Sequence, residues 1–174
     1  SVALSAGSLP SGLTLSTAGV LSGTPTRVGT FTFTLEAENG TGVTAELDVE
    51  LTIHPGAVDP TAIELSADPA SILADGVTTS TITVSLTDAY DNPISGADVG
   101  LTTTAGTLSD VTDNDDGTYT AILTSATTAG TALVEVTLDG TDTGVTTTVV
   151  FTTTGGGSGS GSGSLPVTGS DAIL

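Results

Sequence analysis

Apolar and polar residues alternate along the chain with a period of two, the pattern of β-strands that bury one face. Phe31, Phe33 and Leu35 alternate with Thr and Glu, and the alternation resumes over residues 43–53 after Asn39-Gly40. An Asn-Gly pair supplies the positive φ angles that a tight turn needs. We therefore expect an antiparallel hairpin with one apolar face and one acidic face. No stretch has a helical stripe.

A break in this pattern divides the chain in two. Residues 54–60 hold two prolines and a glycine, which is typical of a linker between domains. Turn signals at Asp75-Gly76, Asp116-Gly117 and Asp139-Gly140 then separate a second series of short apolar runs. These runs predict strands at 63–65, 81–86, 99–103, 118–123, 132–138 and 145–151. About seven short strands in roughly 90–100 residues fit an Ig-like sandwich.

The predicted fold class is therefore all-β, with tandem Ig-like sandwiches. Residues 1–53 form a first domain that is expected to be incomplete at its N-terminus, because an Ig-like sandwich needs about 100 residues. Residues 61–152 form a second, complete domain. A flexible Gly/Ser linker at 153–164 and a truncated sorting signal at 165–174 follow.

The first domain resembles the cadherin-like bacterial Ig domain found in many surface proteins. The motifs that carry the resemblance are Leu9-Pro10-x-Gly12-Leu13-x-Leu15, Gly19-Val20-Leu21-Ser22-Gly23-Thr24-Pro25 and Gly29-Thr30-Phe31-Thr32-Phe33. Members of that family carry two further strands before the point where this chain starts. The resemblance therefore implies that the chain is truncated there.

The second domain is similar to the Ig-like domains of the invasin and intimin adhesins over nearly its whole length. The matching motifs are Ala74-Asp75-Gly76, Asp91-Asn92-Pro93-x-x-Gly96-Ala97 and Asp116-Gly117-Thr118-Tyr119. The resemblance implies a rod-like spacer, usually strung in tandem, that carries a binding tip away from the cell.

Charge narrows the choice of partners. The chain has 20 acidic residues against one basic residue, Arg27, and a formal net charge of -19. Such a chain cannot neutralise nucleic-acid phosphates or dock on an anionic membrane. Mutual repulsion keeps it soluble and favours a monomer. Without lysine it cannot form a Lys–Asn isopeptide bond, so its stiffness must come from β packing or from ions between domains.

Catalysis is not expected. The chain has no cysteine and a single histidine, His54, which lies beside Pro55 in the linker and is expected to be solvated. A Ser-His-Asp triad would need that histidine, and no nucleophile motif accompanies it. Tyr90 is expected to pack in its loop, and Tyr119 to face the core.

The acidic run Asp113–Gly117 raises the question of calcium. Its spacing fails the EF-hand pattern, because Gly117 occupies a ligand position and Thr124 replaces the bidentate acid. A hairpin turn with solvated acids is favoured. A looser calcium site that uses Asp113, Asp115 and Asp116, with Asp59 or Asp91 from the domain junction, stays open. No other cofactor is expected.

Near the C-terminus, Leu165-Pro166-Val167-Thr168-Gly169 resembles LPxTG, the sorting signal of Gram-positive cell-wall proteins. A sortase needs an extended peptide, and Pro166 fixes its own φ and keeps Leu165 out of helix. The resemblance implies cleavage between Thr168 and Gly169 and attachment of Thr168 to a peptidoglycan precursor. An engineered linker and tag is the alternative; the continuation into Ser170–Leu174 favours a natural signal.

These observations predict the stalk of a sortase-anchored adhesin, secreted to the cell wall and surface of a Gram-positive bacterium. Its expected partners are a sortase, the peptidoglycan precursor and, through a region before Ser1, a ligand on a host or neighbouring cell. The alternatives are a ligand-binding adhesin module and the accessory tail of a secreted, wall-attached enzyme.

Overall fold

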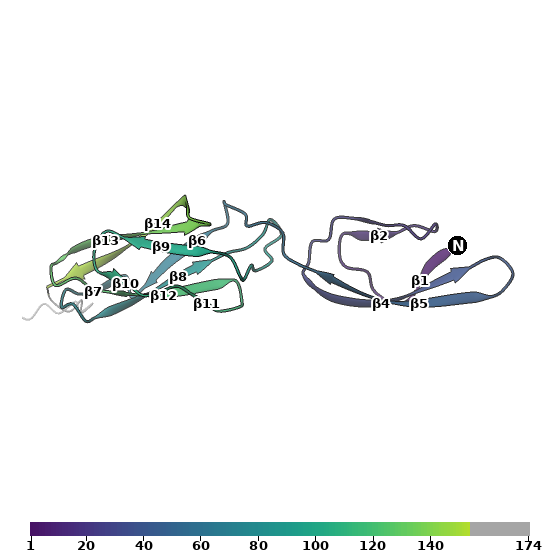
Figure 1. Ribbon diagram of the computed structural model, residues 1–174, viewed down its shortest axis with the longest axis horizontal. Helices are drawn as coiled ribbons and strands as arrows, with labels where there is room; N and C mark the ends of the chain where they lie inside the picture. The colour runs from purple at the N-terminus through teal and green to yellow at the C-terminus, as the bar shows by residue number, and fades with distance from the viewer. Residues whose placement is uncertain (154–174) are drawn as a thin grey trace, which may run out of the picture.

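The computed structural model describes residues 1–153, which form two β modules placed end to end (Figure 1). The first module contains strands β1–β5 and the second contains β6–β14. The expected all-β, Ig-like fold class is confirmed. Within residues 1–153 no helix is long and apolar enough to cross a membrane.

A three-stranded antiparallel sheet and a separate two-stranded ribbon make up the first module. The order in the sheet is β1–β4–β5, with β1 at Val2–Gly7, β4 at Gly29–Glu38 and β5 at Thr44–Ile53. The ribbon pairs β2 (Leu13–Leu15) with β3 (Leu21–Gly23). β4 and β5 form the hairpin that the sequence predicted, paired from Gly29↔Ile53 to Glu38↔Thr44. Among the described strands, β5 pairs with β4 alone and so has a free edge.

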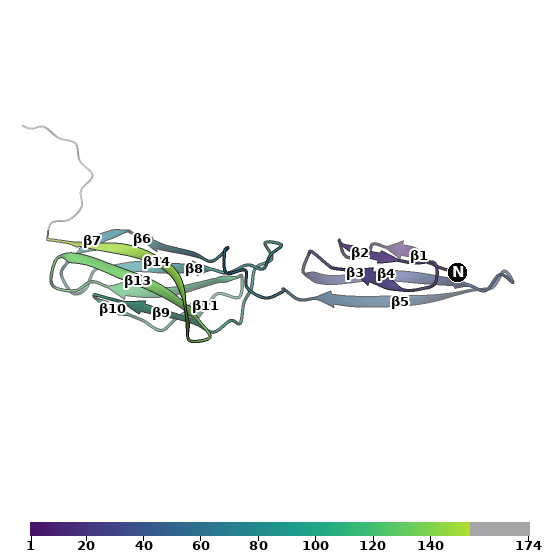
Figure 2. The ribbon, with the colours of Figure 1, turned by 90° about the horizontal axis from the view of Figure 1, so that it is seen from above.

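Burial in the first module is shallow. Phe33 is 5% exposed and Pro10 is fully buried, but Leu47 of β5 is 61% exposed. The β2–β3 ribbon covers the sheet over only part of its length (Figure 2). Apolar side chains of β5 beyond that cover therefore remain in contact with solvent.

The second module is a sandwich of two sheets. One has the order β10–β12–β8–β6, with β11 beside β12, and the other has the order β7–β14–β13–β9. β7 runs parallel to β14, and every other pair is antiparallel. The strands are β6 (Glu64–Asp68), β7 (Ser71–Leu73), β8 (Thr79–Ser85), β9 (Val99–Thr103), β10 (Thr107–Leu108), β11 (Thr112–Asp113), β12 (Thr118–Thr124), β13 (Gly130–Leu138) and β14 (Thr141–Thr152).

The core between the two sheets follows the alternation of the sequence. Every second residue of the central strands points inward and is at most 2% exposed: Ile82, Val84, Tyr119, Ala121, Leu123, Ala132, Val134, Val136, Val149 and Phe151. All the buried apolar residues of the described chain except Pro10 and Phe33 belong to this module. The second module therefore holds most of the apolar burial that stabilises the fold.

The turn between β13 and β14 explains why these two strands pair over most of their length. Asp139 and Gly140 form the two-residue connection, with φ values of 49° and 71°. Positive φ at both positions is the type I′ geometry, which matches the twist of the strands it joins. β14 consequently begins at Thr141, four residues before the predicted start. The sequence prediction missed β1, the β2–β3 ribbon and the short strands β7, β10 and β11.

Candidate functional site

The LPVTG motif, Leu165–Gly169, lies outside the residues that the structure describes. The same holds for the Gly/Ser segment from residue 154 onward. The sortase recognition and attachment residues therefore remain predictions from the sequence.

The acidic run at 113–117 forms a hairpin turn between β11 and β12. The carboxylates of Asp113 and Asp116 accept hydrogen bonds from the turn itself and from one neighbouring loop. Asp113 Oδ1 accepts the N–H of Asp115 at 2.9 Å, and its Oδ2 accepts the N–H of Gly96. Asp116 Oδ1 accepts both the hydroxyl and the N–H of Thr118, and these two bonds lower the pKa of Asp116. The carboxylates thus fix the turn.

The calcium candidates do not converge. Within residues 1–153, no group of three or more His, Cys, Asp or Glu side chains could hold a metal ion. Asp59 was expected as an additional calcium ligand. Its carboxylate instead accepts hydrogen bonds from the hydroxyl and the N–H of Thr61 in its own loop. Asp115 and Asp91 are exposed turn residues with φ values near 60°.

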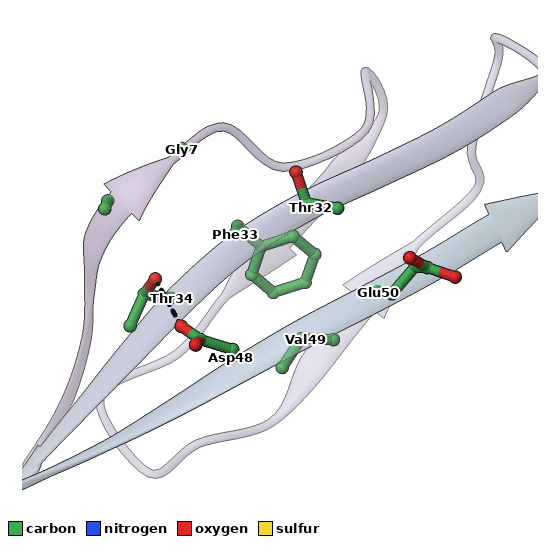
Figure 3. A pocket seen from close by; sticks show the side chains of 8 residues that line it. Gly7, Thr32, Phe33, Thr34, Asp48, Val49 and Glu50 are labelled. Carbon is green, nitrogen blue, oxygen red and sulfur yellow. Dashed lines mark hydrogen bonds between the residues drawn. The ribbon is translucent and has the colours of Figure 1, made fainter.

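An open groove lies on the first module, lined by Ala6, Gly7, Thr32, Phe33, Thr34, Asp48, Val49 and Glu50 (Figure 3). The ring of Phe33 and the side chain of Val49 face its middle. Thr34 donates its hydroxyl to Asp48 at 2.8 Å. The lining includes two carboxylates and neither histidine nor lysine.

Tyr90 and His54 lie in the region that joins the modules. His54 is exposed, as expected for a linker residue. Tyr90 is 50% exposed and lines a second open pocket, together with Asp88 and residues 56–60 of the linker. The expected core position of Tyr119 is confirmed: it is 1% exposed, and its hydroxyl donates to the Ile94 carbonyl and accepts the Ala97 N–H, both at 3.0 Å.

A cluster of buried, hydrogen-bonded polar groups lies where the linker meets the second module. Asp88 is only 4% exposed, and its carboxylate accepts the N–H groups of Gly56 at 2.9 Å, Tyr90 at 2.9 Å and Asn92 at 3.0 Å. Burial alone would raise the pKa of Asp88, but the hydrogen bonds, first that from Gly56, outweigh it and lower the pKa to about 2. Asp88 is therefore a buried anion at neutral pH, held by donors from the linker and from its own loop.

Asn92 connects this anion to the first module. It is 9% exposed, and its Nδ2 donates to both oxygens of Asp88 at 3.0 Å. Nδ2 also donates to the Thr26 carbonyl, and Oδ1 accepts the Val28 N–H, both at 3.2 Å. Asp88 and Asn92 therefore link the second module, the linker and the loop before β4 in one network. We define these three contacting parts as the joint.

In the sequence, Asp91-Asn92-Pro93 stood out only as part of the invasin-like motif, with Asp91 also a calcium candidate, and Asp88 was not singled out. The sequence does not show which segment supplies the hydrogen-bond partners of Asn92, because Thr26 and Asn92 are 66 residues apart.

Comparison with known families identifies the second module. Residues 59–154, more than half of the chain, match the family model described as "Invasin, domain 3". The chain belongs to the invasin domain 3 family. Residues 1–54 match the model described as "Putative Ig domain". Both Ig-like resemblances stated from the sequence are confirmed.

Solved structures of invasin-type proteins share this fold. The integrin-binding bacterial protein invasin is 38% identical over 76% of this chain, with a TM-score of 0.55. The Yersinia pseudotuberculosis adhesin InvE is 40% identical over 54% of this chain, with a TM-score of 0.52. InvD of the same organism is 28% identical over 87% of this chain, with a TM-score of 0.62.

The chain spans 26% of the invasin structure, 27% of InvE and 46% of InvD. It thus contains the kind of Ig-like domain that builds a structural region of bacterial surface adhesins.

Proposed function

We propose that this chain is a spacer in a sortase-anchored bacterial surface adhesin. The observation that supports the spacer role best is the hydrogen-bonded joint between two Ig-like modules placed end to end (Figures 1 and 2). A spacer must keep its modules in line, and a joint that orders the linker restricts their bending.

The surface suits such a role. A net charge of -19 with one basic residue produces self-repulsion along the rod. The same charge repels anionic polymers of a cell envelope. Charge of one sign therefore favours an extended rod that stays clear of the surface to which it is attached.

Attachment rests on the sequence of the tail. In this proposal a sortase of a Gram-positive bacterium recognises Leu165, Pro166, Val167, Thr168 and Gly169. The sortase thiolate attacks the Thr168 carbonyl, and the bond to Gly169 breaks with release of its amine. An amine of the peptidoglycan precursor then attacks the thioester, so Thr168 becomes amide-linked to the wall. A ligand on a host or neighbouring cell would be bound by another part of the protein.

The test uses the whole chain, a sortase that cleaves LPxTG and a glycine-bearing amine. Mass spectrometry should show loss of Gly169–Leu174 and a new amide at Thr168. Pro166→Ala should slow the reaction and Thr168→Ala should impair it, because each changes a fixed position of the motif. Val167→Glu is the control, since it alters only the variable position.

A chain that stays intact with several active sortases would overturn the attachment. Equal rates for Pro166→Ala, Thr168→Ala and Val167→Glu would show that the motif is not what the enzyme reads.

A further inference from the structure

Asn92 contacts the first module in an unusual way, through the backbone on both sides of one residue. Its Nδ2 donates to the carbonyl before Arg27, and its Oδ1 accepts the N–H after Arg27, both at 3.2 Å. Arg27 itself is a bend, so one side-chain amide bonds the peptide groups on both sides of a change in chain direction. The side-chain amide thus stands in for a peptide group.

From this geometry we propose that the Asp88–Asn92 loop is a docking site for the backbone of the module that precedes it. Asn92 makes the contact and Asp88 positions Asn92. The inference deepens the proposed spacer role, because it assigns residues to the alignment of successive modules.

Asp88 determines which way the Asn92 amide points. A carboxylate only accepts hydrogen bonds, so the NH₂ group must face Asp88 and Oδ1 must face Val28. With Nδ2 bonded to Asp88 and Thr26, both of its protons are used. Bonds to a buried anion are stronger than neutral ones, so the amide is held in this orientation before the first module arrives.

The linker is part of the same arrangement. Gly56 donates its N–H to Asp88 Oδ2 at 2.9 Å, which fixes the path of the chain between the two modules. Asp88 is hydrogen-bonded to the linker and to Asn92 at once, so losing it would release both restraints.

The partner is recognised by main chain alone. The two bonds involve the Thr26 carbonyl and the Val28 N–H, and the Arg27 side chain between them is exposed. A preceding module therefore needs one bend whose flanking carbonyl and N–H groups are turned toward the loop. Its side chains are free to vary, so modules of different sequence can be joined in the same orientation.

The first test changes the second module and measures the first. In Asn92→Ala, the Val28 N–H loses its acceptor, and its hydrogen exchange should quicken by about fivefold, as expected for one neutral hydrogen bond. Amides of the β4–β5 ladder should keep their rates. Asn114→Ala is the matched control, because the Asn114 side chain bonds only Thr118 and Thr120 within its own hairpin.

The second test measures the orientation of the modules. The chain has no cysteine, so the double variant Glu46→Cys, Thr146→Cys can carry a pair of spin labels, one on each module. Pulsed electron resonance should give one narrow distance distribution for the wild type and for Asn114→Ala. Asn92→Ala and Asp88→Asn should lose the narrow distribution while the second module stays folded by circular dichroism.

Unchanged Val28 exchange in Asn92→Ala would overturn the proposal, as would equal effects in Asn114→Ala. A narrow distance distribution in Asn92→Ala would also overturn it, and that variant decides the matter even if Asp88→Asn does not fold. None of these measurements involves residues 165–169, so failure of the sortase reaction leaves their outcome unaffected.

Discussion

Replacing Tyr119 with phenylalanine removes one hydroxyl from the core of the second module and keeps the ring. That hydroxyl joins two backbone groups of the loop after β8, the Ile94 carbonyl and the Ala97 N–H, each at 3.0 Å. In the variant both groups lose their partner.

The cost follows from their burial. An unpaired buried polar group costs about 1–3 kcal/mol. Ile94 and Ala97 are half-buried, so water reaches them in part, and we expect a loss of about 1–2 kcal/mol for the pair. For a domain of this size, that corresponds to a fall in Tm of about 5–15 °C.

Thermal and urea unfolding followed by circular dichroism measure this loss. The urea midpoint should fall with an unchanged m-value, because the substitution does not alter the surface exposed on unfolding. Tyr90→Phe is the matched control: Tyr90 is half exposed, and its stability change should stay within about 0.5 kcal/mol.

The same hydroxyl gives a pH signature. Burial, the largest cause, raises the pKa of Tyr119 above 10.0; the Ala97 N–H opposes this, and the charges of Asp113 and Asp115 raise it further. A raised pKa favours the protonated form in the native state, so this stability is complete below pH 10 and lost as pH rises through the folded pKa. Tyr119→Phe should lack this alkaline loss. Equal melting of wild type and Tyr119→Phe, or an equal loss in Tyr90→Phe, would refute this account of the core.

Two further measurements address the first module and the acidic turn. Amides of β5 should exchange faster than those of β8 and β12, because β5 has a free edge and exposed apolar residues such as Leu47. Equally slow exchange in both modules would contradict this expectation. Ca²⁺ and Mg²⁺ should raise Tm equally at matched ionic strength, since the carboxylates of Asp113 and Asp116 bond within the protein. A rise specific to Ca²⁺ at low concentration would disprove it.

The sequence predicted the long strands well because their alternation extends over many residues. The hairpin of β4 and β5 and the inward side chains of β8, β12 and β13 follow directly from it. The strands β10 and β11 have two residues each, too short to show a period. β7 has three, and only its pairing with the distant β14 defines it.

The joint could not be predicted for a different reason. Its residues lie in a turn whose motif was visible, but its partners come from another module. Local patterns specify which residues favour a turn. They do not specify which surface the turn faces. The burial of Asp88 and Asn92 could therefore not be predicted from the sequence.

The parallel pairing of β7 with β14 has a mechanical consequence. The chain enters the second module at the joint, and β14 ends at the opposite end (Figure 1). A force that stretches the protein therefore pulls β7 and β14 in opposite directions along their common axis. The backbone bonds from Ser71↔Val150 to Leu73↔Thr152 are then loaded in shear and must break together. An antiparallel pair pulled apart at one end would open one bond at a time. The topology thus places resistance to tension where the chain leaves the folded module.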